Sequence, residues 1–80
     1  MSTSQNFDMV RFIVATTMRV PSESITAESS YLNVDGWDSL SNVRLIARLA
    51  EDFEVEFTDD EMEQTTSVAS ILKLIDEKVD

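Results

Sequence analysis

The chain has only one glycine, Gly36, and one proline, Pro21, among 80 residues. This scarcity constrains the fold strongly, because antiparallel β folds need many tight turns built from Gly, Pro and Asn. The apolar residues point the same way, since in three segments they recur at intervals of three and four. The sequence therefore predicts a few helices joined by loops.

The first helical segment runs from about residue 4 to residue 18. Pro21 ends it, because the residue before a proline is pushed out of the helical region. We expect Ser4 or Asn6 to cap this helix, and Asp8 to lie near the positive end of its dipole. One stripe carries its apolar residues Phe7, Val10, Ile13, Val14 and Met18.

Residues 21–38 are polar and rich in serine, and they predict a long irregular loop. Four isolated apolar residues are expected to anchor this loop on the helices: Ile25, Tyr31, Leu32 and Val34.

The second helix is expected to start after Asp38, a strong N-cap residue. Leu40, Val43 and Ala47 fall on a different side from the core-facing stripe. That stripe consists of Leu45, Ile46, Leu49 and Phe53.

Acidic residues dominate the segment from 51 to 63, which holds eight of them and no base. A calcium-binding EF-hand loop starting at Asp52 is excluded, because its sixth position must be glycine and is Phe57. We expect no metal site there, and a short helix from Asp59 to about Gln64.

The last helix is predicted to begin after Thr66 or Ser67 and to run to about Val79. Lys73 and Lys78 lie toward its C-terminal end, where cations are favoured. Its stripe is Val68, Ile71, Leu72, Ile75 and Val79. The fold class is therefore all-α, a small four-helix bundle with three long helices and one short helix, in a single domain over residues 1–80.

Composition limits the function. The chain has no Cys and no His, which removes the thiol nucleophile and the commonest general base, so we do not expect an enzyme. The net charge of −10 disfavours nucleic acids and anionic membranes as partners and favours basic protein surfaces. No membrane span or signal peptide is expected, and the default is a cytoplasmic monomer.

The informative motif is Gly36-Trp37-Asp38-Ser39-Leu40. It places the Ser39 hydroxyl at the first position of a helix, where unpaired backbone N–H groups suit an esterified phosphate. No His, Lys or Cys is nearby in the sequence to activate Ser39 as a nucleophile. Such a serine can still be modified by another enzyme.

On these residues the sequence resembles the acyl carrier proteins, whose signature is Asp-Ser-Leu at the start of the second helix. The resemblance implies that a phosphopantetheinyl transferase attaches 4′-phosphopantetheine from coenzyme A to Ser39, with Asp38 and Leu40 beside it. The thiol of that group holds an acyl or polyketide intermediate as a thioester. The implied partners are the transferase and acyl-loading and acyl-using enzymes such as a ligase, a ketosynthase or an acyltransferase.

The sequence departs from carriers of fatty-acid synthesis, whose second helix is usually strongly acidic. Residues 39–50 hold Arg44 and Arg48 and no acid. Together with Trp37, this favours a discrete carrier of specialised metabolism. The contact face for partners is expected to be Leu40, Val43, Arg44, Ala47 and Arg48.

Two alternatives stay open. A peptidyl or aminoacyl carrier of a nonribosomal pathway differs only in its cargo, which no residue reports. An unmodified acidic module that docks on a basic protein explains the charge, but it leaves the Asp38-Ser39-Leu40 motif as a coincidence.

Overall fold

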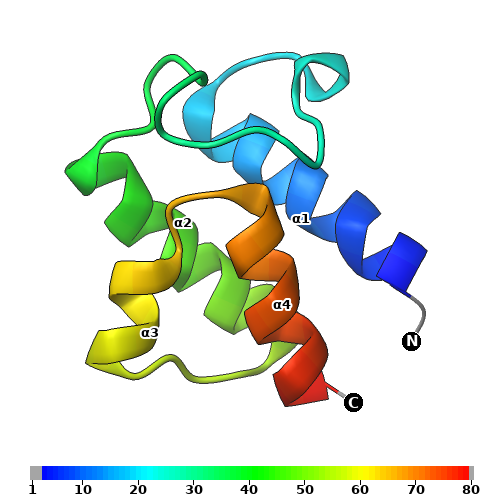
Figure 1. The fold of residues 1–80 in the computed structure, drawn as a ribbon, viewed down its shortest axis with the longest axis vertical. Helices are drawn as coiled ribbons and strands as arrows, with labels where there is room; N and C mark the ends of the chain where they lie inside the picture. Colours follow the sequence, from blue (N-terminus) through cyan, green and yellow to red (C-terminus); the bar gives the residue numbers. More distant parts are fainter. Residues whose placement is uncertain (1–2, 80) are drawn as a thin grey trace.

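The structure, a computed structural model, describes residues 3–79 and, within them, the side chains of residues 5–78. This part of the chain forms four α-helices and one short 3₁₀ turn. Figure 1 shows how they are arranged. No helix in it is long and apolar enough to cross a membrane. The predicted all-α fold with three long helices and one short helix is confirmed. The elements are α1 (Thr3–Met18), η1 (Ser22–Ser24), α2 (Ser39–Phe53), α3 (Asp59–Gln64) and α4 (Val68–Val79).

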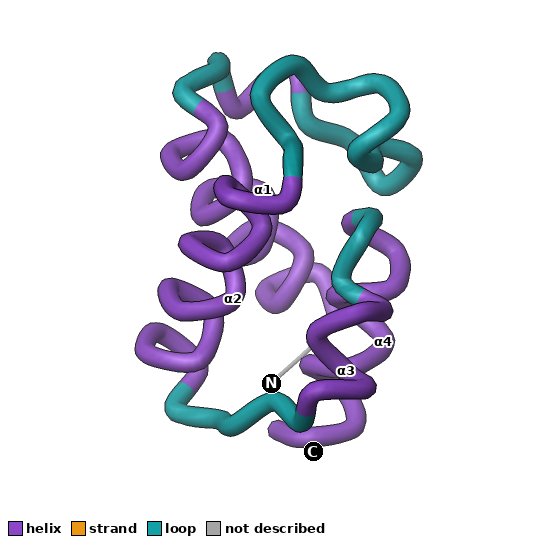
Figure 2. The backbone as a smooth tube through the Cα atoms, turned by 90° about the vertical axis from the view of Figure 1, so that its left-hand side faces the viewer, coloured by secondary structure: helices purple, strands orange, loops and turns teal. Residues whose placement is uncertain are grey.

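The core lies between the three long helices, with α1 in contact with both α2 and α4. The predicted stripes of α1 and α2 are buried, apart from Phe7, which is only partly buried. In α4, Leu72 is partly buried, and the side chain of Val79 lies outside the described part of the chain. Figure 2 shows irregular segments at both ends of the bundle, the long one from α1 to α2 and a short one from α2 to α3. The confirmed core residues are Val10, Ile13, Val14, Met18, Leu45, Ile46, Leu49, Phe53, Val68, Ile71 and Ile75.

Leu74 and Trp37 are among the buried residues that lie outside the predicted stripes. Leu74 is buried because α4 packs against α3 as well as α1, so more than one stripe of this helix is covered. Trp37 is 4% exposed and belongs to the core, although it precedes α2.

The start of α1 differs from the prediction. The helix already includes Thr3, so Ser4 and Asn6 lie inside it rather than at its cap. Asp8 lies beyond the first turn, where it is too far along the helix to act on the dipole end. Asn6 is buried, and its Nδ2 donates a hydrogen bond to Asp76 Oδ1 of α4 at 2.7 Å. The sequence pattern missed this because the partner is distant in the sequence.

Both α1 and α2 end on a residue with left-handed backbone. Arg19 has φ 61° after α1, and Glu54 has φ 56° after α2. In each case the next N–H reaches back five residues: Val20 N–H to the Ala15 carbonyl and Val55 N–H to the Ala50 carbonyl, both at 3.0 Å. This is the bonding of a Schellman motif. The first helix therefore ends shortly before Pro21.

The long loop is anchored both by side chains and by backbone hydrogen bonds. The anchoring roles of Ile25 and Val34 are confirmed, since Ile25 is buried and Val34 is partly buried against the core. The prediction is wrong for Tyr31 and Leu32, which are 54% and 78% exposed. The Tyr31 N–H instead donates to the Thr66 carbonyl.

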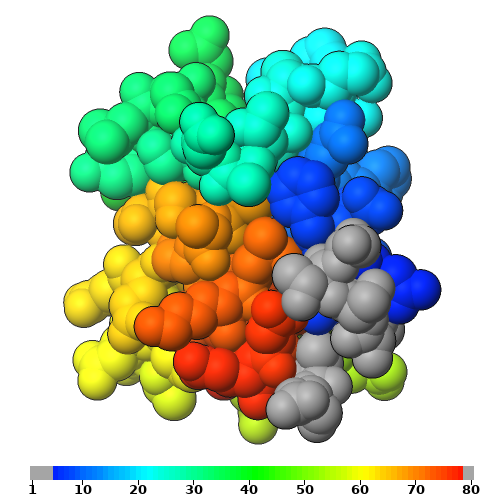
Figure 3. Space-filling view, turned by 45° about the vertical axis from the view of Figure 1, so that its right-hand side comes forward, coloured from blue at the N-terminus to red at the C-terminus, as the bar shows by residue number. Residues whose placement is uncertain are grey.

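A second backbone bond, from the Val68 N–H to the Ser29 carbonyl, continues this contact between the loop and the start of α4. An isolated bridge between Ser30 and Ser67 lies between the two bonds. The side chain of Tyr31 is therefore not needed to hold the loop in place. In Figure 3 the loop forms a cap directly above α4.

Candidate functional site

The Asp38 side chain caps α2 as predicted. Its Oδ1 accepts a hydrogen bond from the Ser41 N–H at 2.9 Å, and its carbonyl accepts from the Asn42 N–H at 2.8 Å. The Ser41 N–H bond lowers the pKa of the Asp38 carboxyl, because it stabilises the ionised form. Ser39 is then the first residue of α2 and is exposed.

Gly36 turns the chain into this helix. It has φ +88°, a conformation that residues with a Cβ rarely adopt, and a Cβ there would lie 3.5 Å from the Met18 carbonyl oxygen. The Asp38 N–H donates to the Gly36 carbonyl at 3.1 Å. Gly36 therefore lies against the end of α1, two residues before the N-cap of α2.

A chain of hydrogen bonds links the residues next to Ser39 to α3. The Trp37 indole Nε1–H donates to Asn42 Oδ1 at 3.1 Å, and Asn42 Nδ2 donates to Thr65 Oγ1 at 3.2 Å. The Thr65 hydroxyl donates in turn to the Met62 carbonyl at 2.8 Å. Since an indole can only donate, this chain of hydrogen bonds also settles which way the Asn42 amide faces. It connects the start of α2 to the end of α3.

Two hollows open beside Ser39. One, of about 500 Å³, lies between the long loop and the start of α2, and we call it the aromatic hollow. Its lining is Tyr31, Trp37, Asp38, Ser39, Asn42 and Thr66.

The other, of about 430 Å³, lies between α2 and α3, and we call it the apolar hollow. It shares Ser39, Asn42 and Thr66 with the first, so these three residues stand where the two hollows meet. Its remaining lining is Val43, Ile46, Met62 and Glu63.

The predicted partner face lies on the exposed side of α2. Leu40 and Val43 are each 65% exposed, which is high for large apolar residues. Ala47, Arg44 and Arg48 are exposed as well. Among the described residues neither arginine forms an ion pair, so both are available to a partner.

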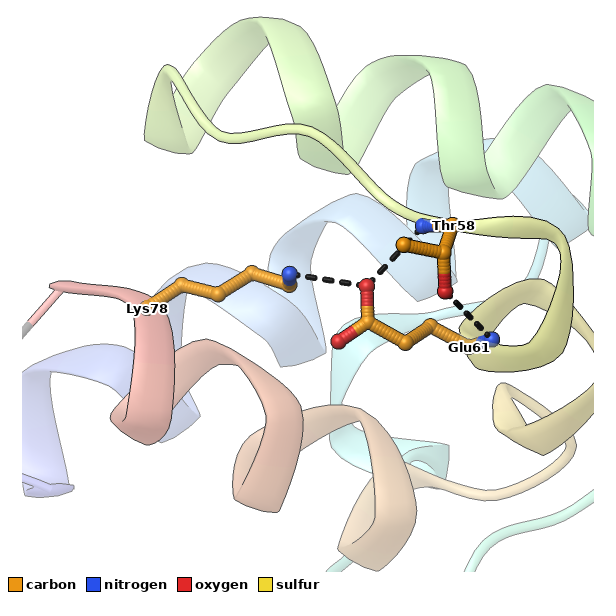
Figure 4. A network of polar contacts seen from close by, with 3 residues as sticks. All are labelled: Thr58, Glu61 and Lys78. Carbon is orange, nitrogen blue, oxygen red and sulfur yellow. Dashed lines mark hydrogen bonds and ion pairs between the residues drawn. The ribbon is translucent and has the colours of Figure 1, made fainter.

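The acidic segment contains no base of its own, but a base from another helix forms an ion pair with it. Lys78 of α4 reaches it, with Nζ 2.8 Å from Glu61 Oε1 and 5.4 Å from the centre of the Phe57 ring. Figure 4 shows Glu61 between Lys78 and Thr58. The bond from Lys78 is the main reason why the pKa of Glu61 is lowered. Between residues 3 and 79 no group of three or more Asp, Glu, His or Cys residues is placed to hold a metal ion.

Three residues beside Ser39 were not predicted from the sequence: Tyr31, Asn42 and Thr66. Only Asn42 left a usable signal, because it is a polar residue three positions before Leu45 on the core-facing side of α2. Tyr31 and Thr66 come from segments that only the fold brings to Ser39.

Comparison with known proteins gives a consistent result. Residues 8–75 match a family described as phosphopantetheine attachment site. An acyl carrier protein of Clostridium acetobutylicum is 36% identical over 69 residues, covering 86% of this chain and 90% of the relative. An acyl carrier protein of Thermosynechococcus vestitus is 37% identical over 79 residues, covering 99% and 98%.

A solved structure agrees with them. The solution structure of a holo acyl carrier protein from Geobacter metallireducens has a TM-score of 0.80 and 29% identity. The match covers 91% of this chain and 84% of that one.

Proposed function

The chain belongs to the acyl carrier proteins with a phosphopantetheine attachment site, and on this basis we propose that Ser39 is the residue that carries the prosthetic group. Members of this family are carriers and not enzymes. Their 4′-phosphopantetheine group supplies the thiol that this cysteine-free chain lacks.

The residues around Ser39 fit such a group. The Ser39 hydroxyl is exposed at the first position of α2, where the backbone N–H groups favour a phosphodiester. It opens onto two hollows, so the attached group has room on either side. No Lys, Arg, His or Cys lines either hollow. A phosphopantetheinyl transferase must therefore activate the hydroxyl.

The observation that carries the proposal is the position of Ser39, which directly follows the capping residue Asp38 and lines both hollows. The test is intact mass after incubation with coenzyme A and a transferase of broad specificity. The parent should gain the mass of one phosphopantetheine, and Ser39→Ala should gain none while remaining folded. Ser41→Ala is the matched control, because its backbone N–H still bonds Asp38. Loading of the Ser39→Ala protein would contradict the assignment.

The pathway and the partners form the second part of the proposal. The carrier serves a specialised pathway, with Leu40, Val43 and Ala47 as apolar contacts and Arg44 and Arg48 as basic contacts for its partner enzymes. The exposure of both arginines and their lack of ion pairs among the described residues support this. A partner that fits this face has acidic residues beside an apolar depression. The names of the relatives favour an acyl carrier over an aminoacyl carrier or an unmodified module.

Charge reversal tests the role of the arginines. Arg44→Glu with Arg48→Glu should lower kcat/KM of the cognate loading enzyme by about tenfold at low salt, because charges at an interface mainly set the encounter rate. The same variant should become a better substrate for fatty-acid-synthesis enzymes. The control is Arg19→Glu with Lys73→Glu, an equal change in charge at exposed positions outside α2. Equal effects of the two double variants would exclude a specific role for the arginines.

A further inference from the structure

The two hollows beside Ser39 differ in chemistry. The apolar hollow is lined mainly by aliphatic and thioether side chains, those of Val43, Ile46 and Met62. The aromatic hollow has Trp37 and Tyr31 in its lining, together with the polar residues Asp38 and Asn42. A cargo attached through Ser39 therefore meets two different environments.

The aromatic hollow has one fixed wall and one adjustable one. Trp37 is almost fully buried, and its indole N–H is held by Asn42. Tyr31 is half exposed, but its backbone is bonded to the Thr66 carbonyl at 3.1 Å. An aromatic ring entering the hollow thus meets a fixed indole, which is 4% exposed, and a phenol ring that is half exposed. A preformed wall lowers the ordering cost of binding.

The hollow also offers a polar contact. An Asn amide nitrogen has two N–H groups, and in the described structure Asn42 Nδ2 bonds one acceptor, Thr65 Oγ1. The second N–H remains for a carbonyl or hydroxyl of a ligand. Asn42 lines both hollows, so this donor stands at the junction between them.

We infer that the aromatic hollow holds short aryl acyl groups, such as hydroxybenzoyl groups, while they are carried through Ser39. This inference rests on the attachment to Ser39 proposed above. A volume of about 500 Å³ is enough for such a group, since ligand pockets commonly measure about 300–1,000 Å³. Tethering makes the local concentration of the group of the order of millimolar, so a dissociation constant of about 1 mM is enough to keep the hollow half occupied. Longer aliphatic groups favour the apolar hollow.

The experiment loads the protein from three donors with a broad transferase: coenzyme A, 4-hydroxybenzoyl-coenzyme A and octanoyl-coenzyme A. Intact mass verifies each loading. The readouts are the emission of Trp37, the one tryptophan of the chain, and the rate at which hydroxylamine cleaves the thioester. The variants are Tyr31→Ala for the aromatic hollow and Met62→Ala for the apolar hollow. Leu32→Ala is the control, since Leu32 is an exposed neighbour that lines neither hollow.

We expect the hydroxybenzoyl group, but not the octanoyl group, to change the Trp37 emission relative to the arm alone. Hydroxylamine should cleave the hydroxybenzoyl thioester about two- to tenfold faster in Tyr31→Ala than in the parent, the range expected for one aromatic pair. Leu32→Ala and Met62→Ala should cleave it at the parent rate. Complete loading with equal rates in the parent and in Tyr31→Ala would overturn the inference alone. A parent protein that gains no mass would overturn the attachment to Ser39 as well.

Discussion

Gly36 lies against the end of α1, two residues before the N-cap of α2, and other residues rarely adopt its backbone conformation. Its φ of +88° lies in the region that L-residues avoid, whereas the contact that a Cβ would make with the Met18 carbonyl, at 3.5 Å, is ordinary. Conformational strain, and not crowding, is therefore the main barrier to a side chain at this position.

The substitution Gly36→Ala should accordingly lower the free energy of unfolding by about 1–2 kcal/mol, the usual penalty for left-handed backbone with a Cβ. For a domain of this size each kcal/mol corresponds to a fall in Tm of roughly 4–8 °C. Thermal unfolding followed by circular dichroism measures it. Asp35→Ala, at the preceding exposed position, is the control and should change Tm little. An unchanged Tm for Gly36→Ala would mean that this turn relaxes without strain.

Asp38 gives the start of α2 a dependence on pH. Its pKa in the folded protein is below the ordinary value of 3.8, chiefly because the Ser41 N–H donates to the carboxylate. A lowered folded pKa adds stability above pH 3.8, and this contribution is lost as the pH falls through the folded pKa. Protonation therefore weakens the cap in the acid range only.

Replacing Asp38 by Asn separates the charge from the cap, because Asn also caps helices well but does not titrate. The difference in unfolding free energy between the parent and Asp38→Asn should be constant at neutral pH and should shrink below pH 3.8. Urea unfolding at a series of pH values measures this difference. Asp35→Asn controls for the loss of one negative charge. A difference that does not vary with pH would show that the Ser41 bond does not depend on ionisation.

Among the helices, α3 has the least support. It has six residues and no buried side chain, and a helix of this length is not stable by itself in water. A capping box holds its start: the Glu61 N–H donates to Thr58 Oγ1 at 3.2 Å, and the Thr58 N–H donates to Glu61 Oε1 at 2.9 Å. Lys78 bonds the same Glu61 oxygen and connects α3 to α4.

Removing the cap by Thr58→Ala should open α3 locally. A lost N-cap costs about 1 kcal/mol, which corresponds to about fivefold faster amide exchange where exchange follows local opening. Exchange of residues 61–64 should rise by this factor while the core amides of α1 stay protected. Thr16→Ala, an exposed position on α1, is the control. A uniform rise over all helices would show instead that α3 unfolds only with the whole domain.

The three long helices were predictable from the sequence because their apolar residues repeat with helical spacing, and the cap of α2 was predictable because it is local. Asp38, for example, bonds an N–H only three residues away. The features that were missed depend on contacts between distant segments. The Asn6 side chain bonds Asp76, Glu61 bonds Lys78, and Asn42 bonds Thr65. The position of Ser39 at the start of α2 was predictable because the cap of this helix is local. The hollow lined by Tyr31 was not predictable, because the long loop has no periodic pattern.

In the whole molecule the charge is unevenly distributed. The net charge is −10, and eight of the sixteen acids fall within residues 51–63. Among the described residues Lys78 is the one base that forms an ion pair with this segment. Arg44 and Arg48 lie on the exposed side of α2 without ion pairs in the described structure. The acidic segment and the two arginines of α2 are thus separate charged regions of the same small protein.

This distribution predicts that added salt stabilises the protein. The acids of residues 51–63 repel one another, and raising the ionic strength from 0.01 M to 1 M shortens the screening length from about 30 Å to about 3 Å. Tm should therefore rise with NaCl. It should rise further with Mg²⁺ at equal ionic strength, since a divalent ion neutralises neighbouring carboxylates together. Scanning calorimetry measures both effects.

Two pairs of substitutions locate the source of the repulsion. Glu51→Gln with Glu56→Gln removes two exposed charges from the acidic segment, whereas Glu23→Gln with Glu28→Gln removes two exposed charges from the long loop. Both leave the same net charge, so general repulsion predicts equal salt slopes. Repulsion within residues 51–63 predicts a smaller slope for the first pair only, because the ion pair of Lys78 reaches one acid, Glu61, and leaves the others uncompensated. A flat slope in the parent would mean that the Lys78 contact and solvent already relieve the repulsion in this segment.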